Sequence, residues 1–212
     1  MNSIKNDLVD SYNKQAIHRD KSFSPDWKKR ERNYFLKHLY NNNKRTLLEI
    51  GAGTGKDSLF FKENGLDTRS IDISPEMIKL CKSKGLHAEV MSFDSLDFPN
   101  NHFDAVWALN CLLHVPKKNL PEVLAEISRV LKPTGLIFIG IYGGKYFEGV
   151  WEEDSYEPKR FFSFYDHDSI KEVLTEFFDI EYFQVIPASV VGGSLDFQSI
   201  MLRNRRSTYE QN

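Results

Sequence analysis

Short apolar runs alternate with segments of helical periodicity through the middle of the chain. The strand-like runs cover residues 45–53, 67–74, 87–94, 103–113 and 135–142. Between them, apolar residues recur at helical spacing over 56–65, 75–84 and 120–132. Strand and helix in strict alternation predict a parallel sheet with helices on both faces, and right-handed crossovers make such a sheet doubly wound.

The two ends of the chain follow a different pattern. After a helical segment at 167–178, two strand-like runs at 179–187 and 196–204 succeed each other without an intervening helix. This order predicts an antiparallel hairpin at one edge of the sheet. Residues 7–16 and 27–39 are helical in pattern and precede the first strand. We therefore expect an α/β fold, with a mostly parallel seven-stranded sheet, an antiparallel last strand and an N-terminal helical addition.

The composition excludes several classes of protein. With 41% hydrophobic and 27% charged residues, the 212-residue chain can bury a core and is not expected to be disordered. Cys81 and Cys111 stand apart from any Cys or His cluster, so neither a disulfide scaffold nor a metal site is expected. No apolar run approaches the roughly 18 residues of a membrane span, and the N-terminus has no apolar signal segment. These features predict a cytoplasmic protein without membrane contact.

The net charge of −2 conceals a strong polarity along the chain. Residues 1–46 hold eleven Lys or Arg against five acids, a net of +6, whereas residues 143–182 hold four against eleven, a net of −7. A generally basic surface for nucleic acid is not expected at this overall balance. The acidic segment also argues against a polyanionic acceptor if it lies at the mouth of a site.

A glycine-rich segment, Glu49-Ile50-Gly51-Ala52-Gly53-Thr54-Gly55, joins the first strand to the first helix of the alternating pattern. Glycines let the backbone turn tightly and let a ligand approach closely, and the helix start supplies free N–H groups. Lys56 stands where a dinucleotide-binding GxGxxG segment has its third glycine. Asp72 ends the second strand, where a carboxylate can accept both hydroxyls of a ribose.

Four segments of the chain resemble the class I S-adenosylmethionine-dependent methyltransferases, in their small-molecule branch of the type 11/25 kind. They are LEIGAGTG at 48–55, IDISPEM at 71–77, FDAVWALNCLLHVP at 103–116 and EISRVLKPTG at 126–135. The resemblance implies the Rossmann-like methyltransferase fold and S-adenosyl-L-methionine as cofactor. It also implies a single domain over 1–212, divided into an N-terminal helical lid (1–44), a cofactor-binding core (45–142), a substrate-lid segment (143–166) and a C-terminal helix and hairpin (167–204).

The resemblance assigns cofactor contacts residue by residue. The glycine loop would line the methionine end, Asp72 would hold the ribose, and Asp94 would accept the adenine amino group. The full set of expected cofactor residues is Tyr12, Gly51, Ala52, Gly53, Gly55, Asp72, Ile73, Met77, Asp94, Ser95, Leu109 and Asn110.

Several side chains have two interpretations that the sequence leaves open. His114 is either a general base or a packing histidine, and Tyr12 is either a lid residue or ordinary packing. Arg30 or Arg32 can meet the cofactor carboxylate or belong to a solvated basic face. Cys111 is expected to pack in the core. Trp151, Phe161 and Tyr165, together with Phe162, are candidates for binding a flat or cationic substrate, or cover a sheet edge.

The leading hypothesis is methyl transfer to an N or O nucleophile of a small molecule, driven by alignment of the reactants. We expect a monomer or a homodimer with a small-molecule acceptor. Two alternatives remain. One is an RNA or protein methyltransferase that docks through the basic N-terminal segment and Arg203, Arg205 and Arg206. The other is a non-catalytic accessory protein that keeps the cofactor fold, and a nicotinamide-dependent oxidoreductase is disfavoured by Lys56.

Overall fold

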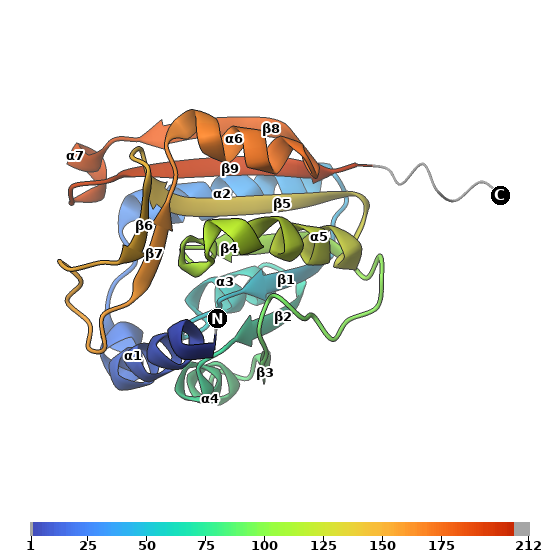
Figure 1. Ribbon diagram of the computed structural model, residues 1–212. Coiled ribbons are helices and arrows are strands. Elements are labelled where there is room, and N and C mark those ends of the chain that lie inside the picture. Colours follow the sequence, from blue (N-terminus) through green and yellow to red (C-terminus); the bar gives the residue numbers. More distant parts are fainter. Residues whose placement is uncertain (1, 206–212) are drawn as a thin grey trace.

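The computed structural model describes residues 2–205, which form a seven-stranded sheet flanked by helices and a separate two-stranded sheet (Figure 1). The strands are β1 (Thr46–Ile50), β2 (Asp67–Asp72), β3 (His87–Val90), β4 (Phe103–Leu109), β5 (Leu131–Gly143), β6 (Phe147–Val150), β7 (Phe161–Phe164), β8 (Phe178–Ile186) and β9 (Asp196–Asn204). The α-helices are α1 (Asn2–Lys21), α2 (Asp26–Asn41), α3 (Lys56–Glu63), α4 (Pro75–Ser83), α5 (Leu120–Val130), α6 (His167–Thr175) and α7 (Ala188–Val191), and short 3₁₀ turns lie at Leu112–His114 and Lys117–Asn119.

The order of strands in the main sheet is β3-β2-β1-β4-β5-β9-β8. Strands β1 to β5 pair in parallel, whereas β9 runs antiparallel to both β5 and β8. The doubly wound sheet with an antiparallel last strand and an edge hairpin, expected from the sequence, is therefore confirmed. The strand order reverses at β1 and β4, and ligands of open α/β sheets bind outside the carboxyl ends of such strands.

Alternate residues of the central strands enter two different cores. Leu47, Trp107 and Phe138 pack against Phe35 of α2 on one face of the sheet. Their neighbours in the chain, such as Leu48, Val106 and Ile137, face the other core with α5 and α6. In Figure 1, α2 and α3 lie behind the sheet, with α5 and α6 in front. Burial on both faces explains why these strands are apolar throughout.

The structure shortens two predicted strands and lengthens another. The run at 87–94 ends as a strand at Val90, so Asp94 lies in the loop that follows. The run at 103–113 ends as a strand at Leu109, because Asn110 adopts a left-handed backbone (φ 56°) and a 3₁₀ turn follows. The predicted helix 120–132 ends at Val130, where the amides of Asn101 and His102 bind the last helical carbonyls. Strand β5 consequently begins at Leu131, before Pro133 rather than after it.

The segment 143–166 contains a small antiparallel sheet of β6 and β7. Together with α1 it lies at one end of the main sheet (Figure 1). The Ser11 hydroxyl donates to the Pro158 carbonyl, which joins α1 to this segment. Within residues 2–205, no helix has the length and apolar character needed to cross a membrane.

Candidate functional site

The carboxylate of Asp72 holds the glycine loop in place. Its Oδ2 accepts a hydrogen bond from the Gly53 amide at 2.8 Å, and its Oδ1 accepts one from the Ser74 amide at 2.8 Å. Burial raises the pKa of Asp72, and these backbone N–H groups oppose that shift. Each oxygen keeps a lone pair for a further donor. The carboxylate can therefore hold the loop and bind a ligand at the same time.

The glycines of the loop meet two different requirements. Gly51 has φ +66°, and a Cβ there would lie 2.4 Å from Cβ of Cys111, so the backbone conformation and the close approach both require glycine. Gly53 also has a positive φ, but no atom lies within 4 Å of its hypothetical Cβ. The backbone at Gly53 is therefore open to an approaching ligand.

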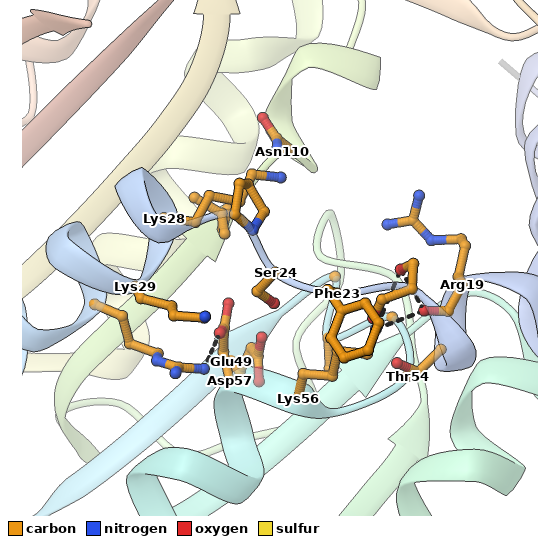
Figure 2. Close-up of a pocket in the computed structure, with 17 residues that line it drawn as sticks. Arg19, Phe23, Ser24, Lys28, Lys29, Glu49, Thr54, Lys56, Asp57 and Asn110 are labelled. Carbon is orange, nitrogen blue, oxygen red and sulfur yellow. Dashed lines mark hydrogen bonds and ion pairs between the residues drawn. The ribbon is translucent and has the colours of Figure 1, made fainter. Parts of the chain in front are cut away.

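Two cavities meet at the loop, and both are lined by Arg19, Gly51, Gly53, Leu109 and Asn110. The first cavity, of about 200 Å³, extends over the start of α3 and the linker between α1 and α2 (Figure 2). The second, of about 50 Å³, extends to Asp72 and Ile73 at the end of β2. The five shared residues make the two cavities parts of one site at the strand ends.

Helix α1 forms the roof of the second cavity. Leu8 and Tyr12 line it, and the Tyr12 hydroxyl hydrogen-bonds Nε2 of His114 at 2.8 Å. Arg160 donates to the same hydroxyl at 3.0 Å and makes a bidentate ion pair with Asp154. Tyr12 therefore connects α1 to the end of β4 and to the segment that carries β7.

Both ring nitrogens of His114 have partners. Nδ1 lies 2.8 Å from the Phe161 carbonyl, which only accepts, so Nδ1 carries the proton and Nε2 accepts from Tyr12. Burial, with a further contribution from Arg160, lowers the pKa of His114 to about 3. In this arrangement the imidazole is neutral and fully hydrogen-bonded, and it can act as a base only after Tyr12 moves away. Its catalytic role stays a prediction.

We expect the His114 ring to remain neutral from pH 8 to pH 5, with the proton on Nδ1. Because the folded pKa lies below the usual value near 6.5, His114 supports the folded state fully above that pH. That support is lost as the pH falls from about 6.5 towards 3, where the unfolded chain binds the proton more strongly. Ring ¹⁵N shifts, assigned with a His114→Gln variant, test this. A His114 titration near pH 6.5 would contradict it.

Asn110 is a strained residue with an unpaired polar atom. Its backbone is left-handed, its amide donates to the Gly140 carbonyl at 2.7 Å, and its side-chain Oδ1 is buried without a hydrogen-bond partner among residues 2–205. Such strain collects at ligand-binding positions. A buried acceptor without a donor is costly, so this atom is suited to receive an N–H or O–H from a ligand in the shared part of the site.

The expected cofactor residues fall into two groups. Those that line at least one of the two cavities are Tyr12, Gly51, Ala52, Gly53, Asp72, Ile73, Leu109 and Asn110. The others, Gly55, Met77, Asp94 and Ser95, line neither. Gly55 is the N-cap residue of α3, and a Cβ there would lie 2.8 Å from Sγ of Cys81, while Met77 is fully buried. Asp94 pairs with Lys5 of α1 through one oxygen, and its carboxylate keeps lone pairs for a further donor.

The candidate substrate residues Trp151, Phe161 and Tyr165 line neither cavity. Trp151 packs edge-on against Phe147, and Tyr165 is buried. Phe161 instead contributes its carbonyl to His114. In this arrangement the three aromatic residues pack within the segment 143–166. Their contact with a substrate stays a prediction.

Sequence reasoning overlooked several residues that line the cavities: Leu8, Lys28, Met91 and Phe93. Met91 and Phe93 directly follow β3, a position at the carboxyl edge that could have suggested them. Leu8 and Lys28 reach the site only through the way α1 and α2 pack. Arg32 lines the first cavity and pairs with Asp57 at 2.7 Å, whereas Arg30 is exposed.

The remaining candidates are structural in this arrangement. Burial raises the pKa of the Cys111 thiol, which disfavours the nucleophilic thiolate. In the basic tail, Arg203 pairs with Glu181 and Arg205 with Asp179 at 3.1 Å, and Arg206 lies outside the described residues. Within residues 2–205, no group of three or more His, Cys, Asp or Glu side chains is placed to hold a metal ion.

The chain is similar in sequence to known methyltransferases. Residues 48–139 match the sequence model of a methyltransferase domain. The chain is 31% identical over 97 residues to demethylmenaquinone methyltransferase of Tropheryma whipplei, covering 44% of this chain and 40% of that protein. It is 25% identical over 142 residues to phosphoethanolamine N-methyltransferase of Plasmodium falciparum, covering 63% and 53%. The chain therefore spans about half the length of these relatives.

A solved structure extends the similarity of fold over nearly the whole chain. It is 1,6-didemethyltoxoflavin-N1-methyltransferase of Burkholderia thailandensis, with bound 1,6-didemethyltoxoflavin and S-adenosylhomocysteine. The TM-score is 0.72 at 20% identity, covering 95% of this chain and 87% of that one. The chain therefore contains, at residues 48–139, a region similar in sequence to a methyltransferase domain, within a fold that it shares with a solved methyltransferase.

Proposed function

We propose that this protein transfers the methyl group of S-adenosylmethionine to a nitrogen or oxygen nucleophile of a small molecule. The observation that carries the proposal is the position of Asp72, held by two backbone amides where the glycine loop meets the second cavity. A carboxylate there suits the two hydroxyls of a ribose. The relatives named above act on small molecules, which supports an acceptor of that kind.

The residues present fit the cofactor along the length of the site. Ile73 and Phe93 provide apolar surface for an adenine next to Asp72. The open backbone at Gly53 leads to the first cavity, where Arg19 can bind a carboxylate. When bound, the cofactor supplies an activated methyl group, and the task of the chain is to align the acceptor and exclude water.

Helix α1 has to shift before an adenosine can enter. The second cavity is about 50 Å³, and Leu8 and Tyr12 fill the space above Asp72. The contacts that hold α1 in place include Tyr12 with His114, Lys5 with Asp94 and Asp20 with Lys84. We infer that α1 opens to admit the cofactor and then closes over it, which is consistent with the expected lid at 1–44.

Calorimetric titration with S-adenosylmethionine, S-adenosylhomocysteine and NADH tests the cofactor half of the proposal. We expect the two adenosyl ligands to bind with Kd values of micromolar order, about −8 kcal/mol, and NADH not to bind. Absence of adenosyl binding, or equal binding of NADH, would overturn the proposal. Formation of S-adenosylhomocysteine with amine and hydroxyl acceptors then tests catalysis, and binding without turnover on any acceptor would favour the accessory protein.

A further inference from the structure

The first cavity is lined by more basic than acidic side chains (Figure 2). The basic ones are Arg19, Lys28, Lys29, Arg32 and Lys56, and the acidic ones are Glu49 and Asp57. Burial and the nearby Asp57 raise the pKa of the Glu49 carboxyl well above its usual range. The acidic segment 143–182 contributes no side chain to either cavity at the glycine loop. The negative charges of this segment therefore form no part of the cavity walls, so its net charge alone does not argue against an anionic acceptor.

Most of these basic groups already have partners in the fold. Arg32 pairs with Asp57 at 2.7 Å, and Lys29 pairs with Asp26 at 3.0 Å. Lys56 donates to backbone carbonyls of the linker between α1 and α2, and Arg19 donates to the Tyr156 hydroxyl at 3.0 Å. These four side chains therefore already donate hydrogen bonds or form ion pairs within the fold, and Lys28 is the remaining basic side chain of the cavity.

Lys28 has neither a hydrogen bond nor an ion pair within residues 2–205. Its ammonium lies 5.3 Å from the ring centroid of Trp27, and its side chain is half-buried in the cavity wall. Burial and the positive charges of Arg19 and Lys56 lower its pKa to about 8. An ammonium in such surroundings is stabilised by any anion that enters the cavity.

Two candidate anions are the carboxylate of the cofactor and an anionic group of the acceptor. Arg19 lines both cavities, so a cofactor that extends from Asp72 along the glycine loop meets Arg19. Lys28 lines only the first cavity, farther from Asp72. The sulfonium and ammonium of S-adenosylmethionine outweigh its single carboxylate, so the loaded site is more positive than the empty one and attracts an anion more strongly.

On the basis of the proposed function, we propose that Lys28 binds a carboxylate or phosphate group of the acceptor. The acceptor's N–H or O–H would meet the unpaired Oδ1 of Asn110, which lines the shared part of the site. The substrate class is thus a small amine or alcohol that also carries an anionic group. A purely cationic or neutral apolar acceptor would leave Lys28 unpaired.

The test is calorimetric titration of inorganic phosphate, and separately of acetate, into protein saturated with S-adenosylmethionine. We expect a Lys28→Met variant to lose about tenfold or more in affinity for whichever anion binds, as for loss of one charge-assisted contact. Lys28→Arg is expected to retain it, and Lys37→Met, an exposed change on α2 outside both cavities, is the matched control. The two anions distinguish a phosphate from a carboxylate subsite. Saturation with S-adenosylhomocysteine instead should weaken anion binding.

Several outcomes would overturn this inference. If neither anion binds the loaded protein, or if both bind Lys28→Met and wild type equally, Lys28 does not form an anion subsite. A tenfold loss of S-adenosylmethionine affinity in Lys28→Met would instead assign the residue to the cofactor. These results differ from failure of the proposed function, in which wild type itself does not bind S-adenosylmethionine. Unchanged melting temperatures of the variants would show that folding is not the cause.

Discussion

Asp72→Asn is expected to weaken S-adenosylmethionine binding by about 1–3 kcal/mol, which is roughly 5- to 150-fold in Kd. The carboxylate accepts from the Gly53 and Ser74 amides and has lone pairs left for ribose hydroxyls. An asparagine side chain keeps one acceptor oxygen but turns an NH₂ group toward one of those amides. The variant therefore loses the charge at the ribose and also loosens the glycine loop.

The matched control is Asp67→Asn, at the exposed start of the same strand β2. Calorimetry gives the affinity, and thermal melting of the unliganded protein gives the part of the effect that belongs to the loop. We expect Asp67→Asn to change neither quantity appreciably. An Asp72→Asn variant that binds S-adenosylmethionine as tightly as wild type would remove this carboxylate from the site.

Gly51→Ala is expected to destabilise the protein by about 2–5 kcal/mol. A positive φ costs a residue with a Cβ about 1–2 kcal/mol, and the new methyl group would lie 2.4 Å from Cβ of Cys111, which adds an overpacking cost. Relief requires the loop and the start of the 3₁₀ turn after β4 to move apart. Because both segments line the site, ligand affinity should fall together with stability.

Gly53→Ala separates the two causes. Gly53 shares the positive φ, but no atom lies within 4 Å of its hypothetical Cβ, so only the backbone cost of about 1–2 kcal/mol is expected. Midpoints of urea unfolding for the two variants give the comparison. Equal losses of stability would show that the contact with Cys111 is relieved at no cost, contrary to the structure. The new methyl of Gly53→Ala is nevertheless expected to reduce cofactor affinity, because Gly53 lines both cavities.

The closed position of α1 links these predictions. Tyr12 hydrogen-bonds His114, the predicted general base, and Lys5 pairs with Asp94, the predicted partner of the adenine. Both contacts are made by the same helix. Movement of α1 would free both at once. Helix α1 would then compete with a ligand for the polar groups of the site, in addition to covering the site.

Local patterns in the sequence were sufficient for the sheet and for the glycine loop beside the cavities. The apolar runs and helical periods between residues 45 and 142 depend on near neighbours, and they predicted β1 to β5 and the helices between them. The glycine loop and Asp72 are also local, because the end of a parallel strand is a defined place in such a fold. The strand end at Leu109 escaped prediction, since nothing in the apolar run 103–113 signals the left-handed backbone of Asn110.

Contacts between distant segments were decided by tertiary structure alone. His114 is neutral because burial lowers its pKa, and its two ring nitrogens are hydrogen-bonded to Tyr12 and Phe161, which lie far from it in sequence. Lys28 faces the cavity, and the acidic segment does not, because of how α1, α2 and the β6–β7 segment pack over the strand ends. The net charge of a segment does not determine which of its side chains line a cavity. Sequence patterns determined the sheet and its glycine loop, and packing of the covering segments determined which charged side chains line the cavities beside that loop.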